Sequence, residues 1–343
     1  MEPIKTAIVG LGRIASLLED DSLREKPCTH AGAVLANPDC ALVAGADIDS
    51  ARRGLFAERW RVPVYADAAG MLREHRPALL CIATHPDSHL HYCSLAAEYG
   101  VPVVICEKPL ADSLHAARKI GELQKNGHVR IITNHERRYA ADYTEAREIL
   151  GKEELGRLLS VKAALYMGRT VRLRDLLWHD GTHLIDALMF LTGCLPQHKK
   201  RFGAPLSCRD GTVFLSGYLR PAGKDTKKAA AGLCRRKSVG ASVPFVIEAG
   251  AGRDHLVFGM EFSCERGRIR IGNGVFEVWK SGPSPYAEKF SSLRKTRDGF
   301  NGPTGYFANM IADAVACVRD PARRPCSGAD DGLRVIEYLH GLG

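Results

Sequence analysis

Residues 5–15, KTAIVGLGRIA, join an apolar run to closely spaced glycines and indicate how the first part of the chain folds. The run KTAIV is typical of a buried strand, and GLGRIA follows it in the spacing GxGxxA. Glycines at such a turn let the backbone approach a pyrophosphate, whose charge is stabilised by the N-terminus of the helix that follows. The stretch therefore predicts a dinucleotide-binding loop that uses Gly10, Gly12, Arg13 and Ile14 and opens a helix; a tight turn without a ligand is the alternative.

The pattern around this loop predicts a Rossmann domain over residues 1–135. Segments of helical length, such as Asp87–Tyr99 and Ser113–Asn126, separate apolar runs that lack a polar face. Runs of this kind are typical of strands that are buried on both sides of a doubly wound parallel sheet. The expected strands are Thr6–Val9, Ala41–Ala46, Ala78–Thr84, Val101–Cys106 and Val129–Thr133.

Residues 136–343 predict a second domain of the α+β class. Its apolar runs are longer and carry polar residues on one face, which favours a mostly antiparallel sheet, and Asn273-Gly274 between two of them is a strong hairpin signal. The expected strands include Leu158–Met167, Thr212–Leu219, Val243–Glu248 and His255–Cys264. The expected helices are Gly181–Leu191, Thr304–Val318 and Ala329–His340.

The composition excludes several classes of protein. With 45% hydrophobic and 25% charged residues, the 343-residue chain is neither disordered nor collagen-like. No uncharged apolar run approaches the ~18 residues of a membrane-spanning helix, and the chain starts with a strand-like run, so we expect a cytoplasmic protein without a membrane partner. The eleven cysteines form no CxxC pair, which argues against a zinc ribbon, and we expect no metal site.

The formal net charge of +9 raises the question of an anionic partner. Much of the excess lies in Lys199–Arg201 and in the basic residues between Lys224 and Lys237. The second cluster occupies a Gly/Ala-rich stretch without interleaved aromatic residues. It therefore predicts a solvated loop, and we expect no nucleic-acid partner.

Asp47 directly follows the second expected strand, where an acid accepts hydrogen bonds from the adenosine ribose of a dinucleotide. It lies further downstream than usual, which indicates an insertion, Ser16–His30, in the first crossover. A carboxylate here repels a 2′-phosphate and favours NAD over NADP, although Arg52 and Arg53 follow closely. The alternative is that Asp47 or Asp49 only caps the next helix.

Two further motifs carry groups suited to proton chemistry. CEKPLA places Lys108 at the carboxyl end of the fifth expected strand, where open α/β sheets bind ligands. The alternative is a solvent-exposed lysine without a functional role. WHDGTHLIDAL places His179 and His183 four residues apart, which predicts that they share a helix face. Zinc binding is disfavoured because the motif lacks the HExxH glutamate. Two interpretations are left: the histidines serve acid/base chemistry, or they are structural and Asp180 caps the helix.

GLGRIA, CIATHPDSHLHYCSLAAEYGVPVVICEKPLA and HDGTHLIDALMFLTG together resemble the Gfo/Idh/MocA family of nicotinamide-dependent oxidoreductases, and the resemblance runs through essentially the whole chain. It implies a Rossmann domain and a C-terminal domain whose open sheet often forms dimers or tetramers. It also implies NAD(P) and sugar, polyol or inositol substrates.

By position, the resemblance assigns catalytic roles to Lys108, which would polarise the reacting oxygen, and to His183, which would relay the proton. It also places Thr84, His85, His89 and Glu107 around the cofactor. The family's aspartate four residues before the histidine is replaced here by His179, with Asp180 displaced by one position, so either residue is a candidate for that role.

We therefore expect an NAD(P)-dependent oxidoreductase that interconverts a secondary alcohol and a ketone on a sugar-like substrate. An NAD-dependent glycoside hydrolase of the same fold and a non-catalytic dinucleotide-binding regulator are the alternatives. Three arginines, Arg169, Arg172 and Arg174, precede Trp178 and suggest an acidic or phosphorylated sugar, against the simpler interpretation of a charged surface.

Overall fold

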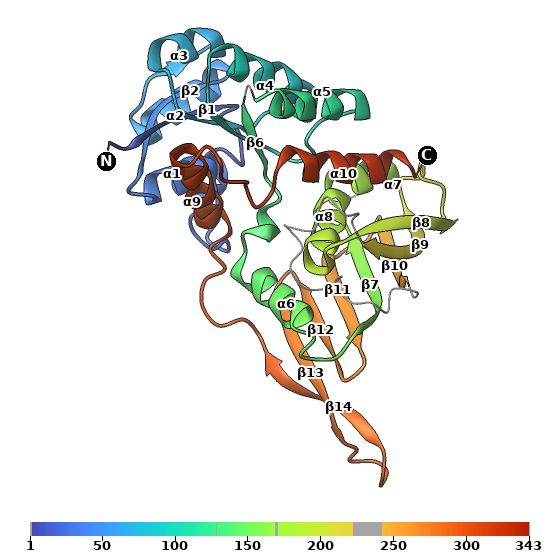
Figure 1. The fold of residues 1–343 in the computed structure, drawn as a ribbon. Coiled ribbons are helices and arrows are strands. Elements are labelled where there is room, and N and C mark those ends of the chain that lie inside the picture. Colours follow the sequence, from blue (N-terminus) through green and yellow to red (C-terminus); the bar gives the residue numbers. More distant parts are fainter. Residues whose placement is uncertain (1, 128, 169–170, 222–241, 343) are drawn as a thin grey trace. The chain divides into compact units, whose positions relative to one another are not determined.

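The computed structural model describes residues 2–127, 129–168, 171–221 and 242–342 (Figure 1). The chain divides into two compact units, Met1–Ala141 with Pro303–Glu337, and Asp142–Gly302 with Tyr338–Gly343. The expected basic loop between Lys224 and Lys237, and Arg169, lie outside the described residues.

The first unit contains the expected parallel sheet. Its six strands are arranged in the order β3-β2-β1-β4-β5-β6, and every pair is parallel. The strand β3, of two residues, was not predicted because it is too short to show a pattern. The strands are β1 (Ile4–Val9), β2 (Cys40–Ala46), β3 (Val64–Tyr65), β4 (Leu79–Ile82), β5 (Val103–Cys106) and β6 (Arg130–Thr133).

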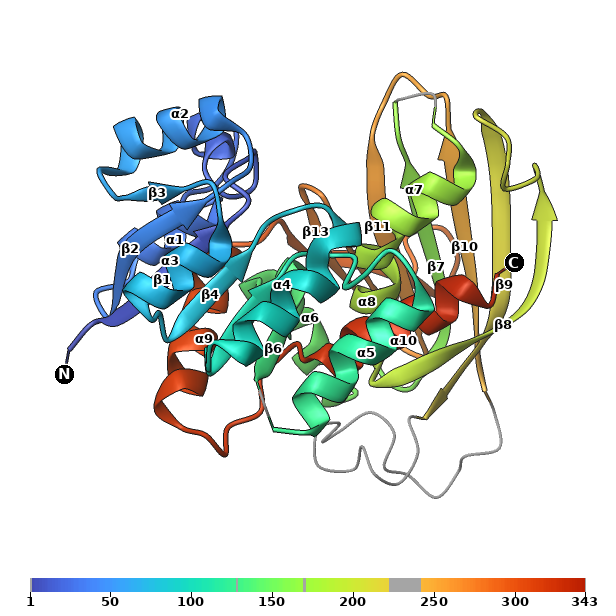
Figure 2. The same cartoon turned by 90° about the horizontal axis from the view of Figure 1, so that it is seen from above.

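Helices connect these strands, as expected for a doubly wound fold (Figure 2). Two helices predicted from the sequence form, and each is followed by a glycine at positive φ, +70° at Gly100 and +75° at Gly127. Only glycine adopts this backbone conformation without strain, so both helices end where the sequence indicated. The helices are α1 (His30–Ala36), α2 (Ser50–Trp60), α3 (Ala68–His75), α4 (His89–Glu98) and α5 (Leu114–Lys125).

The expected helix directly after GLGRIA does not form, because the insertion interrupts it. Residues 13–16 make a turn, a short 3₁₀ helix, η1, covers Leu17–Asp20, and α1 begins only at His30. The amides of His30 and Ala31 nevertheless donate to the carbonyl oxygens of Ile14 and Ala15, at 3.1 and 3.0 Å. The turn after the glycine loop is therefore retained, and hydrogen bonds join it directly to the start of α1.

The division into units differs from the expected boundary at residue 135. The helix α9 (Tyr306–Arg319) and most of α10 (Ala329–His340) belong to the first unit, although the sequence order placed them in the second domain. The physical reason is burial: α9 packs on α1, and its Phe307 and Met310 join the core beneath the parallel sheet. A helix's hydrophobic face is visible in the sequence, but the sheet that covers it is not.

The second unit is built on an eight-stranded sheet in the order β14-β13-β12-β11-β7-β10-β9-β8. It is antiparallel except where β7 pairs with β10, and the predicted hairpin at Asn273-Gly274 joins β12 to β13. Two strands, β8 and β14, were not predicted; they carry mostly polar residues. The strands are β7 (Leu158–Tyr166), β8 (Cys194–Gly203), β9 (Gly211–Pro221), β10 (Val243–Ala251), β11 (Val257–Cys264), β12 (Gly267–Gly272), β13 (Val275–Pro283) and β14 (Ser291–Asp298).

Helices cover one face of this sheet (Figure 1). The helix α8 (Gly181–Thr192) packs on β7 and β8, and α7 (Leu173–His179) packs on α8 and β10. A further helix, α6 (Ala141–Gly151), begins at the junction of the two units. Nearly every residue of α8 is buried, so this helix forms the centre of the second unit's core.

Glu25, within the insertion, holds the start of α9. Its carboxylate accepts hydrogen bonds from the Thr304 amide at 2.8 Å, the Thr304 hydroxyl at 2.9 Å and the Gly305 amide at 2.6 Å. Gly305 is the residue that precedes α9, so the negative charge lies at the positive end of the helix dipole.

We predict that Glu25→Ala lowers the free energy of unfolding of the first unit by about 1–2 kcal/mol, because three donors at a helix start lose their acceptor. Urea denaturation followed by circular dichroism measures the change. Glu288→Ala, at an exposed position in the second unit, is the control and should have no effect. Equal midpoints for the two variants would contradict the role of Glu25.

Candidate functional site

Four loops of the first unit meet at the carboxyl edge of the parallel sheet. They follow β1, β2, β4 and β5 and carry Gly10, Asp47, Thr84 and Lys108. The strand β1 lies between β2 and β4, so the chain reverses its direction of winding there. Open α/β sheets bind ligands outside such a switch point, and the predicted site residues of the first unit therefore lie where the fold can use them.

The glycine loop packs closely against the loop after β4 at its first glycine and is open at its second. Gly10 has a φ of +84°, and a Cβ atom there would lie 2.7 Å from the carbonyl carbon of Ala83 in the neighbouring loop. At Gly12 the nearest atom to such a Cβ would be a guanidinium nitrogen of Arg52, at 3.8 Å. The first glycine is thus needed for packing, and the second leaves open space in which a diphosphate could approach the backbone.

Asp47 is buried and already tied to the glycine loop. Its Oδ2 accepts a hydrogen bond from the Leu11 amide at 2.7 Å, and its Oδ1 accepts from the Asp49 amide at 2.9 Å. Arg52 lies 3.8 Å from the same Oδ2, and its side chain is half exposed. Asp49, not Asp47, caps α2, so the capping alternative holds for Asp49 alone.

The loop after β4 contributes residues of different accessibility. His85 is exposed, whereas His89 is fully buried, with Nδ1 3.1 Å from the Pro109 carbonyl oxygen and Nε2 3.2 Å from that of Thr84. Burial lowers the pKa of the His89 imidazole. His89 therefore joins the Thr84 loop to the loop that carries Lys108, instead of facing the site itself.

Glu107 is a second buried carboxylate of this edge and anchors the Lys108 loop. Its Oε1 lies 2.8 Å from Nε2 of His30 and 2.6 Å from Nδ2 of Asn134, and its Oε2 accepts from the Lys108 amide at 3.3 Å. Burial would raise the pKa of the Glu107 carboxyl, but the hydrogen bonds from His30 and Asn134 and the charge of Lys108 outweigh it and lower the pKa. The side chain therefore stays ionised and supports the loop from within, whereas the sequence had placed it around the cofactor.

Neither partner of Glu107 was predicted from the sequence. His30 ends the insertion and begins α1, and no local pattern relates it to a residue far along the chain. Asn134 follows β6 directly, and this position at the carboxyl edge was a signal that could have identified it. Nδ1 of His30 has no hydrogen-bond partner among the described residues, which is consistent with Nε2 being the nitrogen that donates to Glu107.

The second unit holds the remaining candidates, and they do not share a helix. His179 is the last residue of α7, Asp180 lies between the helices, and His183 is in the first turn of α8. Asp180 precedes α8 in the capping position, but its side chain makes no capping hydrogen bond. The expectation that the two histidines share one continuous helix face is therefore wrong, because α7 ends at His179 and α8 begins at Gly181. His179 is exposed and His183 is half-buried.

Within the described part of the chain, no group of three or more His, Cys, Asp and Glu residues could hold a metal ion. No helix there is long and apolar enough to cross a membrane.

Residues 4–135 match the Gfo/Idh/MocA family model, which describes an oxidoreductase family with an NAD-binding Rossmann fold. Among curated proteins, inositol 2-dehydrogenase from Rubrobacter xylanophilus is 33% identical over 120 residues, which is 35% of this chain and 34% of that protein. D-glucoside 3-dehydrogenase from Escherichia coli is 25% identical over 204 residues, or 56% of this chain and 54% of that protein. The alignments thus span between about a third and a half of these relatives' length.

Solved structures extend the similarity of fold to both units. A dehydrogenase from Chromobacterium violaceum matches with a TM-score of 0.76, over 100% of this chain and 96% of that chain, at 17% sequence identity. At this identity the match shows the fold alone.

We predict that Glu107→Gln lowers the free energy of unfolding by about 1–3 kcal/mol near neutral pH, because the charge that His30 and Asn134 stabilise is removed. The pKa of Glu107 is lowered from its usual 4.5, so this stability is fully present above pH 4.5 and is lost as the pH falls through the lowered value. Urea denaturation at several pH values measures it.

The control is Glu98→Gln at an exposed position near the end of α4, which should leave stability unchanged. A difference between Glu107→Gln and the unmutated protein that is the same at acidic and neutral pH would contradict the ionised state of Glu107.

Proposed function

We propose that this chain, whose residues 4–135 match the Gfo/Idh/MocA family model, is an NAD(P)-dependent oxidoreductase of that family that interconverts a secondary alcohol and a ketone on a sugar, polyol or inositol-like substrate. The observation that carries the proposal is the carboxyl edge of the parallel sheet. There the glycine loop, Asp47 and Lys108 follow neighbouring strands within residues that match the family.

The residues of this edge fit a dinucleotide. The open space at Gly12 suits a diphosphate, and Asp47 stands beside the loop where ribose hydroxyls would be bound. The nicotinamide, when bound, supplies the hydride acceptor or donor. The protein itself would position the glycine loop against the diphosphate, disfavour a cofactor with a 2′-phosphate and transfer the proton.

We assign the polarising role to Lys108. An ammonium group stabilises negative charge that develops on a substrate oxygen, and it cannot abstract a proton while it is charged. The buried Glu107 carboxylate, bonded to the Lys108 amide, fixes the backbone from which the lysine side chain extends. His89 bonds the same loop from the other side through the carbonyls of Pro109 and Leu110.

We assign the proton relay to His183 of the second unit. Oxidation of an alcohol releases a hydroxyl proton, and a neutral imidazole accepts it near pH 7. His179 ends α7 and Asp180 lies between α7 and α8, so either could serve the role that the family gives to an aspartate.

NAD is the proposed cofactor, with NADP disfavoured by the Asp47 carboxylate. The opposing feature is Arg52, whose half-exposed guanidinium lies close to Asp47 and Gly12 and could pair with a 2′-phosphate. The substrate class is suggested by relatives named for inositol and a D-glucoside. Of the three arginines that suggested an acidic substrate, Arg172 is paired with Asp175, with Nε to Oδ2 at 2.6 Å.

A homodimer or homotetramer is part of the proposal. Three large side chains on β8, β9 and β10 are exposed, Phe202 by 53%, Tyr218 by 42% and Val246 by 40%. The ring of Phe202 stacks on that of Phe214, with centroids 5.0 Å apart. Such an apolar patch on an open sheet is typical of a surface that a second chain covers.

The experiment that tests the function is an assay of cofactor reduction with inositols, polyols and glucosides. Net reduction of NAD supports the oxidoreductase. Release of sugar from a glycoside without net reduction would instead indicate a hydrolase, and binding of NAD without either reaction would indicate a regulator.

We predict that the unmutated protein binds NAD more tightly than NADP, and that Asp47→Asn removes most of this preference. Asparagine keeps one oxygen to accept the hydrogen bond from the Leu11 amide, loses the one from the Asp49 amide, and no longer repels a phosphate. Fluorescence titration with both cofactors measures the ratio. Tighter binding of NADP by the unmutated protein would refute the prediction, and Arg52→Ala would then identify the phosphate contact.

We predict that Lys108→Met and His183→Asn each lower kcat by ~10²–10⁴-fold, the usual effect of losing a positioned proton-transfer group, while NAD affinity stays nearly unchanged. The oxidation rate of the unmutated enzyme should also fall on the acid side, because a protonated His183 cannot accept a proton. Steady-state kinetics over a pH range with an identified substrate measures both effects. Near-normal turnover and an unchanged pH profile in His183→Asn would remove the assignment.

A further inference from the structure

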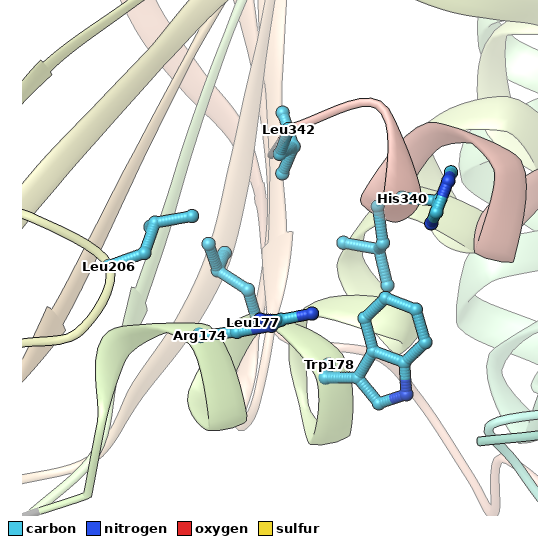
Figure 3. A pocket seen from close by; sticks show the side chains of 7 residues that line it. Arg174, Leu177, Trp178, Leu206, His340 and Leu342 are labelled. Carbon is cyan, nitrogen blue, oxygen red and sulfur yellow. The ribbon is translucent and has the colours of Figure 1, made fainter. Parts of the chain in front are cut away.

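A cavity of about 270 Å³ lies within the second unit (Figure 3). It is formed by one side of α7, the segment after β8 and the end of α10 with the residues that follow. All seven lining residues belong to the second unit: Arg174, Leu177, Trp178, Leu206, Leu339, His340 and Leu342. Its size is just below the roughly 300–1,000 Å³ typical of small-molecule sites.

The walls of the cavity are apolar and held by the backbone. Its four leucines are at most 9% exposed, and the indole of Trp178 adds an aromatic surface. The amide of Leu173 donates to the Cys208 carbonyl at 2.8 Å, and that of Arg174 donates to the Leu206 carbonyl at 2.9 Å. These bonds fix the start of α7 against the opposite wall, so the cavity is formed in advance.

Arg174 supplies a positive charge at this cavity. Among the residues that the structure describes, no carboxylate forms an ion pair with it. Arg172, two residues earlier, has its guanidinium paired with the Asp175 carboxylate, at 2.6 and 3.1 Å. The two arginines thus differ in one respect that matters for binding: one is neutralised by its own helix, and the other is available to an anion.

We propose that this cavity binds a small organic anion with an apolar body, whose carboxylate pairs with Arg174 and whose body fills the space between the leucines and Trp178. A guanidinium forms two parallel hydrogen bonds with a carboxylate, and apolar walls bury the rest of such a ligand. His340, which is exposed at the end of α10, also lines the cavity.

A sugar does not fit this cavity. Each buried hydroxyl needs a hydrogen-bond partner, and of the seven lining side chains only those of Arg174, His340 and Trp178 carry polar atoms. The site is therefore distinct from that of the proposed polyol substrate and does not depend on the proposed oxidoreductase activity.

The test is a binding titration of the full chain, followed by tryptophan fluorescence because Trp178 lines the cavity. Phenylacetate is the probe, phenylacetamide is its uncharged counterpart of the same shape, and inorganic phosphate is an anion without an apolar body. We expect phenylacetate to bind and phenylacetamide to bind about tenfold more weakly. Phosphate should not change the fluorescence signal.

Matched variants separate the charge from the cavity. Arg174→Met should weaken phenylacetate binding about tenfold without changing phenylacetamide binding, whereas Arg172→Met should change neither. Leu206→Phe, which enlarges a wall residue, should weaken both probes. Circular dichroism verifies that each variant is folded.

The proposal is overturned if phenylacetate does not bind at millimolar concentration, if the acid and the amide bind equally, or if Arg172→Met and Arg174→Met have the same effect. None of these measurements requires NAD or turnover. A failure of the proposed oxidoreductase activity would therefore leave this result unchanged, and the reverse is also true.

Discussion

The candidate site of the first unit depends on the hydrogen bonds that the buried Glu107 carboxylate forms with His30 and Asn134. This carboxylate joins the end of β5 to the start of α1 through His30 and to the end of β6 through Asn134. A buried charge is stable only when hydrogen bonds and opposite charge replace water, and the lowered pKa of Glu107 indicates that they do. Lys108 extends from a backbone that is fixed by this arrangement.

The same constraint explains how the insertion is accommodated. The residues of the insertion lie between a glycine loop and the helix that normally follows it at once, yet the amides of His30 and Ala31 bond to the carbonyls of Ile14 and Ala15. His30 thereby reaches Glu107 despite the added residues. Glu25 bonds the insertion to the start of α9, so the extra segment is tied to the rest of the first unit at two places, although residues such as Leu23 are exposed.

The second unit has two regions of different side-chain chemistry, the segment that contains His179 and His183 and the apolar cavity beside α7. The break at Asp180 separates His179 from His183 and allows the two residues different surroundings, one exposed and one half-buried. Further back along α7, Arg174 and Trp178 line a cavity with four leucines, where hydroxyl groups would find few partners. One short helix thus borders both the proposed proton-relay segment and a separate apolar site.

The sequence by itself determined the elements whose signals are local. Buried strands such as β1 and β5, helix ends at Gly100 and Gly127, the hairpin at Asn273-Gly274 and the placement of Lys108 after a strand are all set by residues close in the chain. Tertiary structure alone decided that α9 joins the first unit, that Asp47 is bonded to Leu11, and that His30 and Asn134 meet at Glu107. These contacts join residues far apart in sequence, and their energy comes from burial and pairing that no local pattern records.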